Sequence, residues 1–151
     1  ADGHVNCSPK GLDTFHVLGP RAVAWVDLTG SGAETAAHLR ENGRIVVMFC
    51  AFDGPPRIVR LHGRGTVHPI GSPRFEEMLP LFPDTPGARA VIEIDVARVS
   101  DSCGYAVPLM RYVEERDTLH KWVDRKGDEG LEDYRDGNNR RSLDDLPAFG
   151  D

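Results

Sequence analysis

The stretch that decides the fold runs from Val23 to Phe52, with the sequence VAWVDLTGSGAETAAHLRENGRIVVMFCAF. Apolar residues recur at a period of two from Ala22 to Leu28, which predicts a strand. The glycines of Thr29-Gly30-Ser31-Gly32 then break the pattern, because glycine takes backbone angles that other residues avoid. A helix follows, and the apolar run from Ile45 to Phe52 predicts a second strand, buried on both faces.

The helix has recognisable signals at both ends. Ser31 and Glu34 form an S-x-x-E capping box, and Gly43 ends the helix as a C′ glycine. A glycine-rich turn that opens a helix after a buried strand can bind a phosphate, since backbone N–H groups and the positive helix end point the same way. The competing interpretation is a plain helix cap, which is the commoner use of a capping box, and Glu34 would repel a nearby phosphate. Local sequence leaves both open.

Composition narrows the class of protein. The 151 residues are most simply one domain, and a net charge of −6 with mixed signs gives no indication of nucleic-acid or membrane binding. No apolar run reaches membrane-spanning length. Three cysteines without C-x-x-C spacing argue against a disulfide framework and for a reducing, cytoplasmic compartment. The six histidines are scattered without metal-ligand spacing, so we expect no structural metal.

The segments flanking this unit predict further strands. HVNCS, from His4 to Ser8, is typical of a short strand that ends at Pro9. Lys10 follows at the strand end, where it could bind an anion or simply be a solvated loop lysine. Alternation predicts long strands over residues 58–68 and 91–99, and the two glycines within the first indicate a bulge or a close approach.

The C-terminal third is predicted to be helical. Capping and glycine signals place helices after Ser72-Pro73, from Asp117-Thr118 to Gly127, and from Glu129 to Gly137. The polar tail, residues 140–151, is expected to be loosely held. About six antiparallel strands with inserted helices predict an α+β barrel.

Three motifs together resemble one known family. HVNCSPKG, VDLTGSGAETAAHLRENGRIVVMFCAF and RLHGRG occur in the order seen in the pyridoxamine 5′-phosphate oxidase-like family, in the branch that carries S-P-K-G and T-G-S-G. The resemblance extends from about His4 to Tyr105. It implies a six-stranded antiparallel split β-barrel with flanking helices in residues 1–106, with a first strand before residue 1. Residues 107–151 would then be a helical extension packed on the same domain.

The resemblance also implies a cofactor site. Such proteins are homodimers that bind FMN in clefts between the subunits, with a lysine and the glycine-rich turn at the phosphate. This agrees with the residues themselves, because an ammonium and a helix N-terminus then converge on one dianion. The implied FMN contacts in this chain are Asn6, Ser8, Lys10, Thr29, Gly30, Ser31, Gly32, Thr35, Phe49 and Cys50.

The chain departs from the oxidases proper at several positions. They carry an Arg-Lys pair where this chain has Glu34-Thr35, and an arginine near Val5. Their C-terminal substrate signature is not visible in residues 107–151. We therefore expect an FMN-dependent oxidoreductase acting on an unassigned small molecule, without pyridoxamine phosphate oxidase activity itself. No side chain stands out as a general acid or base, which is consistent with chemistry carried by the cofactor.

Two other functions stay open from the sequence. The first is a flavin- or haem-binding carrier or sensor without turnover. The second is a deazaflavin-dependent reductase, which would need a basic groove from residues such as Arg40, Arg44, Arg57 and Arg60. Each of these arginines has a simpler role as the solvated partner of a nearby acid.

Overall fold

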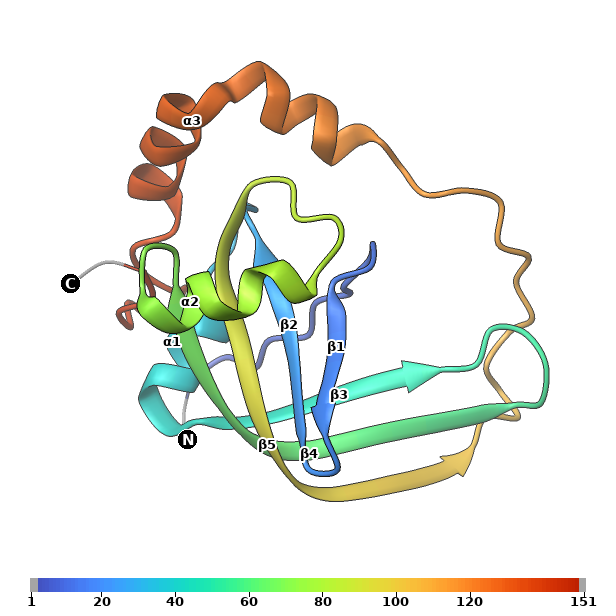
Figure 1. Cartoon of the computed structure of the whole chain (residues 1–151). Helices are drawn as coiled ribbons and strands as arrows, with labels where there is room; N and C mark the ends of the chain where they lie inside the picture. The colour runs from blue at the N-terminus through green and yellow to red at the C-terminus, as the bar shows by residue number, and fades with distance from the viewer. Residues whose placement is uncertain (1–2, 150–151) are drawn as a thin grey trace.

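The computed structural model describes residues 3–149, and it shows an α+β protein built on one antiparallel sheet (Figure 1). The order of strands across the five-stranded sheet is β1-β2-β5-β4-β3, and every neighbouring pair is antiparallel. The strands are β1 (Phe15–Gly19), β2 (Ala22–Leu28), β3 (Arg44–Cys50), β4 (Arg57–Pro69) and β5 (Ala88–Cys103).

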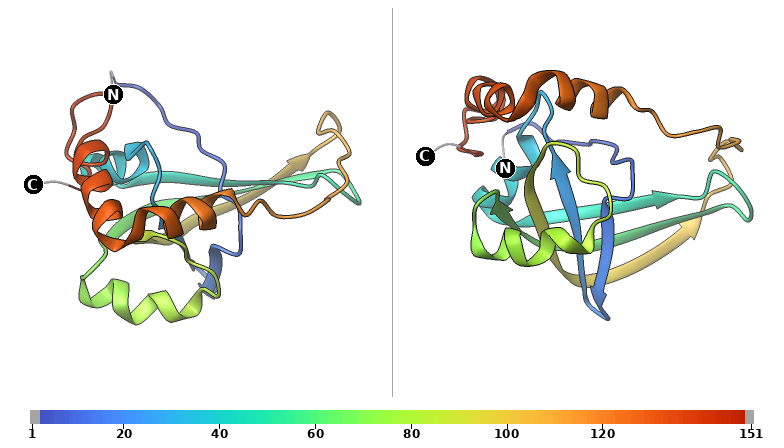
Figure 2. Two further views of the ribbon diagram at one scale, coloured as in Figure 1. Left: turned by 90° about the horizontal axis from the view of Figure 1, so that it is seen from above. Right: turned by 45° about the horizontal axis from the view of Figure 1, so that its top comes forward.

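Two helices cover opposite sides of the sheet, as the view from above shows (Figure 2). The helices are α1 (Glu34–Asn42), α2 (Pro73–Met78), the short 3₁₀ turn η1 (Leu79–Leu81) and α3 (Thr118–Asn138). Phe75 and Met78 of α2 pack on Ala24 and Val26 of β2. On the other side, Leu39 of α1 packs in a second cluster that includes Trp25, Ile92 and Ile94. The strand β2 is therefore buried on both faces, which explains why its sequence is almost wholly apolar.

The long strands β4 and β5 bend where the sequence predicted a bulge. The register between them shifts between His62 and Gly63. A Cβ at Gly63 would collide with the carbonyl oxygen of Asp95. Only glycine fits where the two backbones come so close, so the prediction of a bulge is confirmed and its cause is a steric one.

The prediction that the strand after α1 is buried on both faces is wrong. β3 is an edge strand that pairs with β4 alone, and Val46 and Met48 are 51% and 52% exposed. Ile45 and Val47 face the core and pack there. The apolar side chains on the other face of β3, including Val46 and Met48, are not covered by any element within residues 3–149. β3, β4 and β5 extend together beyond β1 as a long arm (Figure 1).

The expected count of six strands is also wrong for the described residues, which form five. The segment predicted as a strand, residues 4–8, is exposed and forms no ladder. In place of a neighbouring strand, the Asn6 side chain binds Thr35 of α1, and the His4 side chain binds Asp144 of the C-terminal tail. β1 and β3 are the two ends of the strand order, so the sheet is open.

The C-terminal third forms a strap and a bent helix. Residues 104–117 form neither helix nor strand and lead across the molecule to α3 (Figures 1 and 2). Gly127, at φ 63° and ψ 177°, interrupts α3, which confirms the predicted break between two helical segments. None of the helices in residues 3–149 has the length and apolarity needed to cross a bilayer.

The tail is held more firmly than the sequence predicted. Ala148 is 2% exposed and packs against Ala33, Ala36 and Ala37 at the start of α1. A bridge between Arg141 and Pro147 closes the preceding loop. The prediction of a loosely held tail is therefore wrong up to residue 149, and residues 150–151 lie outside the described part.

Candidate functional site

A buried ion pair lies directly behind the glycine-rich turn. Asp27, near the end of β2, accepts a hydrogen bond of 2.8 Å from Nε of Arg89, near the start of β5. The other two nitrogens of Arg89 donate to the carbonyl oxygens of Gly30 and Gly32, at 3.3 and 2.7 Å. Asp27 and Arg89 are only 4% and 6% exposed. One guanidinium therefore joins the end of the strand to both glycines of the turn.

A second set of contacts reaches the turn from α3. Nε of Arg135 donates to the Thr29 hydroxyl at 2.9 Å, and Nδ2 of Asn139 donates to the Gly30 carbonyl at 2.9 Å. The Thr29 hydroxyl in turn donates to the Gly87 carbonyl at 2.6 Å. Burial, together with the nearby charge of Arg89, lowers the pKa of the Arg135 guanidinium. The C-terminal helix is thus part of the structure that shapes the turn.

These contacts decide which backbone groups of the turn are left for a ligand. The carbonyls of Gly30 and Gly32 are bound on the inner side by Arg89 and Asn139. The N–H groups of Gly30, Ser31 and Gly32 have no acceptor within residues 3–149, and α1 begins two residues later. Successive N–H groups next to a helix N-terminus form a concave donor surface that suits an anion.

The predicted capping box is not formed. The N-cap of α1 is Ala33, and no side chain caps the helix. Oε1 of Glu34 instead accepts the backbone N–H of Leu143 at 2.9 Å, and Oε2 lies 3.9 Å from Nε2 of His38. Because the Glu34 carboxylate binds the C-terminal tail, it does not form the reciprocal bond of a capping box. The C′ glycine is confirmed, with Gly43 at φ 70°.

Lys10 lies at the end of β2, next to the turn. Its ammonium is 3.1 Å from Oδ1 of Asp27, whose other oxygen binds Arg89. The preceding residues lie along the start of α1, where Nδ2 of Asn6 donates to the Thr35 hydroxyl at 2.8 Å and to the Ser8 hydroxyl at 3.5 Å. The structure therefore brings together Asn6, Ser8 and Thr35 by direct contact, and joins Lys10 to the turn through Asp27.

The remaining predicted residues lie on the edge strand. The Phe49 ring packs edge-on against Phe15, with 5.1 Å between the ring centroids. Cys50 is half-buried and pairs with Ile58 in the ladder. No hydrogen bond or ring contact within residues 3–149 connects either residue to the glycine-rich turn.

The four arginines considered for a basic groove have ordinary partners instead. Arg40 donates to the Ala148 carbonyl, Arg44 to Asn42, and Arg60 to Ser102. Arg57 lies 3.9 Å from Asp101. Arg57 therefore has the acidic partner that was expected, whereas these contacts of Arg40, Arg44 and Arg60 are to a backbone carbonyl, an amide oxygen and a hydroxyl.

The residues that bind the turn from behind were not predicted from the sequence. Asp27 gave a usable signal, since it is the single charged residue in the apolar strand AVAWVDL. Arg89 gave a weaker one at the start of another apolar strand. Arg135 and Asn139 gave none, because they lie 106 and 109 residues from Thr29 and Gly30, which they contact.

An ion pair links the N-terminal segment to the tail. Nδ1 of His4 lies 2.7 Å from Oδ1 of Asp144, and the His4 backbone N–H donates to the second oxygen at 2.7 Å. These hydrogen bonds raise the pKa of the His4 imidazole and lower the pKa of the Asp144 carboxyl. The segment carrying Asn6, Ser8 and Lys10 is therefore attached by a titratable contact.

Comparison with known proteins gives the family. The model of the family described as pyridoxamine 5′-phosphate oxidase matches residues 1–103, which is more than half of the chain. The chain belongs to this family, as the three motifs predicted.

One curated relative and two solved structures are similar to this chain. The chain is 44% identical over 163 residues to the pyridoxamine 5′-phosphate oxidase family protein ustO of Aspergillus flavus. That match covers 97% of this chain and 66% of the relative, so the chain spans slightly less than two thirds of the relative's length. Two crystal structures of HupZ from Group A Streptococcus match at 15% identity, with TM-scores of 0.47 and 0.45. They cover 59% and 58% of this chain, and 73% and 68% of their own.

Proposed function

We propose that this protein binds FMN at the glycine-rich turn and is an oxidoreductase acting on a small organic molecule. Membership of the pyridoxamine 5′-phosphate oxidase family supports a flavin-binding split barrel. The single observation that carries the proposal is the arrangement of the turn. Its carbonyls are bound from behind, its N–H groups have no acceptor within residues 3–149, and the ammonium of Lys10 is held beside it by Asp27.

The charges around the turn fit a phosphate ester. Three cations, those of Lys10, Arg89 and Arg135, lie within contact of the turn or of Asp27, and within residues 3–149 Asp27 is the one carboxylate bonded to them. Positive charge is therefore in excess at the turn, which favours an anion. Glu34 replaces a cation found in the oxidases, but its carboxylate is bound by the tail.

The proposed cofactor-binding residues form two groups, one that would bind the phosphate of FMN and one that would contact the rest of the cofactor. Lys10, the hydroxyl of Thr35 and the N–H groups of residues 30–32 would hold the phosphate. Asn6 and Ser8 would supply hydrogen bonds to polar groups further along the cofactor. Phe49 and Cys50, on β3, are proposed as contacts of its ring. When bound, FMN supplies hydride chemistry, and the protein binds and orients it.

We also propose that the protein is a homodimer with the cofactor at the subunit interface. The arm formed by β3, β4 and β5 carries large apolar side chains that are more than 40% exposed, namely Val46, Met48, Phe49, Phe52 and Val99. An exposed apolar surface of this kind is typical of a protein interface. A second copy of the chain covering this arm would bury Phe49.

The test begins with the absorbance spectrum of the purified protein and mass spectrometry of whatever heat releases. Flavin bands with released FMN would support the proposal, and NADH- or NADPH-dependent reduction of the bound flavin would support the oxidoreductase. A colourless protein that also fails to bind added FMN would overturn it. Bound flavin without any turnover would assign the protein as a carrier or sensor.

A further inference from the structure

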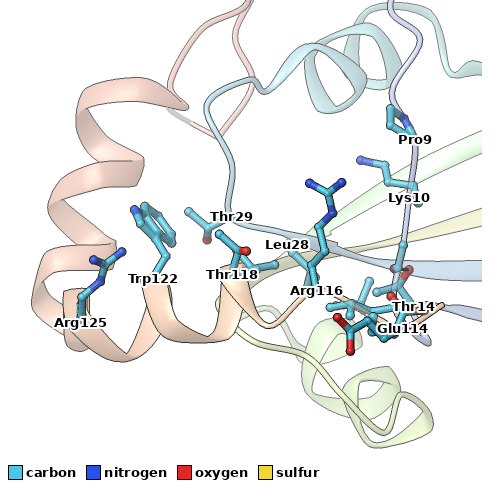
Figure 3. A pocket seen from close by; sticks show the side chains of 15 residues that line it. Pro9, Lys10, Thr14, Leu28, Thr29, Glu114, Arg116, Thr118, Trp122 and Arg125 are labelled. Atoms are coloured by element: carbon cyan, nitrogen blue, oxygen red, sulfur yellow. Dashed lines mark hydrogen bonds between the residues drawn. The ribbon is translucent and has the colours of Figure 1, made fainter.

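A pocket of about 700 Å³ opens beside the glycine-rich turn (Figure 3). Three parts of the chain form it, namely residues 9–14, the end of β2, and residues 114–125 at the start of α3. Thr29 lines the pocket and is also the first residue of the turn, so the pocket adjoins the proposed phosphate site. The α3 wall lies outside residues 1–103, which match the family model. This wall is therefore a feature of the C-terminal extension.

The wall from α3 offers an apolar surface. Leu119 and Trp122 line the pocket opposite Leu28 of β2, and all three side chains are partly buried. The Trp122 ring packs edge-on against Tyr134 with 5.0 Å between centroids, which fixes the orientation of the indole. A fixed indole beside aliphatic side chains binds the apolar body of a small molecule, preferably one with a ring.

The mouth of the pocket carries a guanidinium without a partner. Arg116 makes no hydrogen bond or ion pair with any residue from 3 to 149. Figure 3 shows its side chain and that of Lys10 extending toward one another from opposite walls. Among the described residues, the ammonium of Lys10 has a single partner, the carboxylate of Asp27, which also binds Arg89. Two cations therefore line the same pocket, and of these two Lys10 is paired with a carboxylate and Arg116 is not, among residues 3–149.

Two carboxylates, those of Glu114 and Glu115, also line the pocket, and neither forms an ion pair or hydrogen bond with Arg116 in the described part of the chain. Desolvation, together with the charge of Glu115 and its hydrogen bond with the phenol, raises the pKa of Tyr112. Glu114 is drawn beside Thr14, on the side of the pocket away from the Arg116 head group (Figure 3). A planar guanidinium left in this way forms two parallel hydrogen bonds with a carboxylate, which an ammonium cannot do.

We propose that this pocket binds a small organic carboxylate with an apolar, ring-bearing body. Arg116 binds the carboxylate, and Trp122 and Leu119 contact the body. This inference rests on the proposed function where it treats the pocket as the substrate subsite, because it then names the substrate class of the proposed oxidoreductase. Binding of the carboxylate itself does not depend on the flavin.

The test follows the two indole N–H signals in ¹H–¹⁵N NMR spectra of the protein without flavin. The probes are 3-phenylpropionate and its neutral match 3-phenylpropanamide, and the Trp122→Phe variant assigns the signals. We expect 3-phenylpropionate to shift the Trp122 signal, while Trp25, which is 5% exposed, serves as the internal control. The amide should bind about tenfold more weakly or worse, the loss expected for a charge-assisted hydrogen bond.

Two variants locate the charge. Arg116→Gln should weaken binding of 3-phenylpropionate about tenfold or more. Arg111→Gln is the matched control, since Arg111 belongs to the same strap but does not line the pocket, and its affinity should equal that of the parent protein. Equal affinity for acid and amide, an unshifted Trp122 signal, or an unaffected Arg116→Gln variant would each overturn the proposal.

Repeating the titration with FMN separates this proposal from the proposed function. Simultaneous binding of FMN and 3-phenylpropionate supports a subsite beside the cofactor. Competition between them assigns the pocket to the cofactor and overturns the substrate subsite. If FMN fails to bind while the acid still does, the carboxylate site stands and the FMN proposal fails.

Discussion

Arg89 and Asp27 form a buried ion pair at 2.8 Å that also determines how the glycine-rich turn faces solvent. The same guanidinium binds the carbonyls of Gly30 and Gly32. We predict that Arg89→Ala lowers the free energy of unfolding by about 3–5 kcal/mol, because it leaves a buried carboxylate with Lys10 as its one remaining cation. Chemical denaturation measures this loss.

Arg89→Lys is the matched control that separates the positive charge of Arg89 from the geometry of its three hydrogen-bond donors. An ammonium keeps the charge but cannot reach three acceptors in different directions, so stability should be partly restored while FMN affinity stays reduced. A loss below about 1 kcal/mol in Arg89→Ala would contradict the structural role given to the pair.

Lys10 is the cation that the motif places at the phosphate, and the structure holds it on Asp27 beside the turn. We predict that Lys10→Ala weakens FMN binding by about 1.5–3 kcal/mol, the range for a hydrogen bond to a charged group. Isothermal titration of the cofactor-free protein measures the affinity. Lys121→Ala, at an exposed lysine paired with Asp117, should leave it unchanged. An unaltered FMN titration in Lys10→Ala would remove Lys10 from the site.

The two serines near helix starts provide a direct test of the capping correction. Ser72 caps α2 by accepting the N–H of Phe75 at 3.3 Å, whereas Ser31 caps nothing. Ser72→Ala should therefore destabilise the protein by about 1 kcal/mol, and Ser31→Ala by less than about 0.5 kcal/mol. Thermal or denaturant unfolding of both variants checks this. Equal losses of stability in the two variants would mean that Ser31 does cap α1 in solution.

Asn139 connects the C-terminal helix to the turn, since it is fully buried and donates to Gly30. Asn139→Ala removes this hydrogen bond, and we predict a loss of about 0.5–1.5 kcal/mol in stability together with weaker FMN binding. The neighbouring exposed residue offers a control, because Asn138→Ala removes only a bond within α3 to Tyr134. FMN affinity that falls equally in both variants would mean that Asn139 has no particular role at the turn.

The contact between His4 and Asp144 makes attachment of the N-terminal segment depend on pH. The pKa of His4 is raised from 6.5, so its contribution is complete below pH 6.5 and is lost as the pH rises through the higher folded value. The pKa of Asp144 is lowered from 3.8, so its contribution is complete above pH 3.8 and is lost as the pH falls through the lower folded value. The N-terminal segment should therefore be most firmly attached between pH 3.8 and pH 6.5.

An NMR titration of the His4 imidazole measures the raised pKa, and exchange of its amide proton reports detachment. Asp144→Asn should return the pKa of His4 toward 6.5, because it removes the charged acceptor. A titration of His4 that is the same in Asp144→Asn and in the parent protein would show that the segment is not held by this pair.

Local sequence predicted the elements whose cause is local. The period of two over residues 22–28 gave β2 with its observed bounds, and Gly43 and Ser72 ended or began helices as expected. The glycines of residues 58–68 predicted the bulge at Gly63. Each of these follows from backbone angles, from the space at one residue, or from hydrogen bonds within a few residues.

The sequence also predicted the family, because the motifs that carry the resemblance are contiguous. It singled out Lys10 and the glycine-rich turn, which the structure joins through Asp27. What it could not give was the outcome of competition between distant partners. Glu34 is a capping residue by spacing, yet the tail at Leu143 takes its carboxylate. Ile45 to Cys50 is apolar enough for a central strand, yet its place at the end of the strand order leaves one face exposed.

The sequence by itself determined the order of strand, turn, helix and strand, and with it the presence of the glycine-rich turn. The tertiary structure decided how that turn is used, since Arg89, Arg135 and Asn139 reach it from β5 and α3 and bind its carbonyls and its threonine hydroxyl. The physical reason is that hydrogen bonds in a turn are satisfied by whichever groups the fold brings close, and separation along the chain carries no information about them.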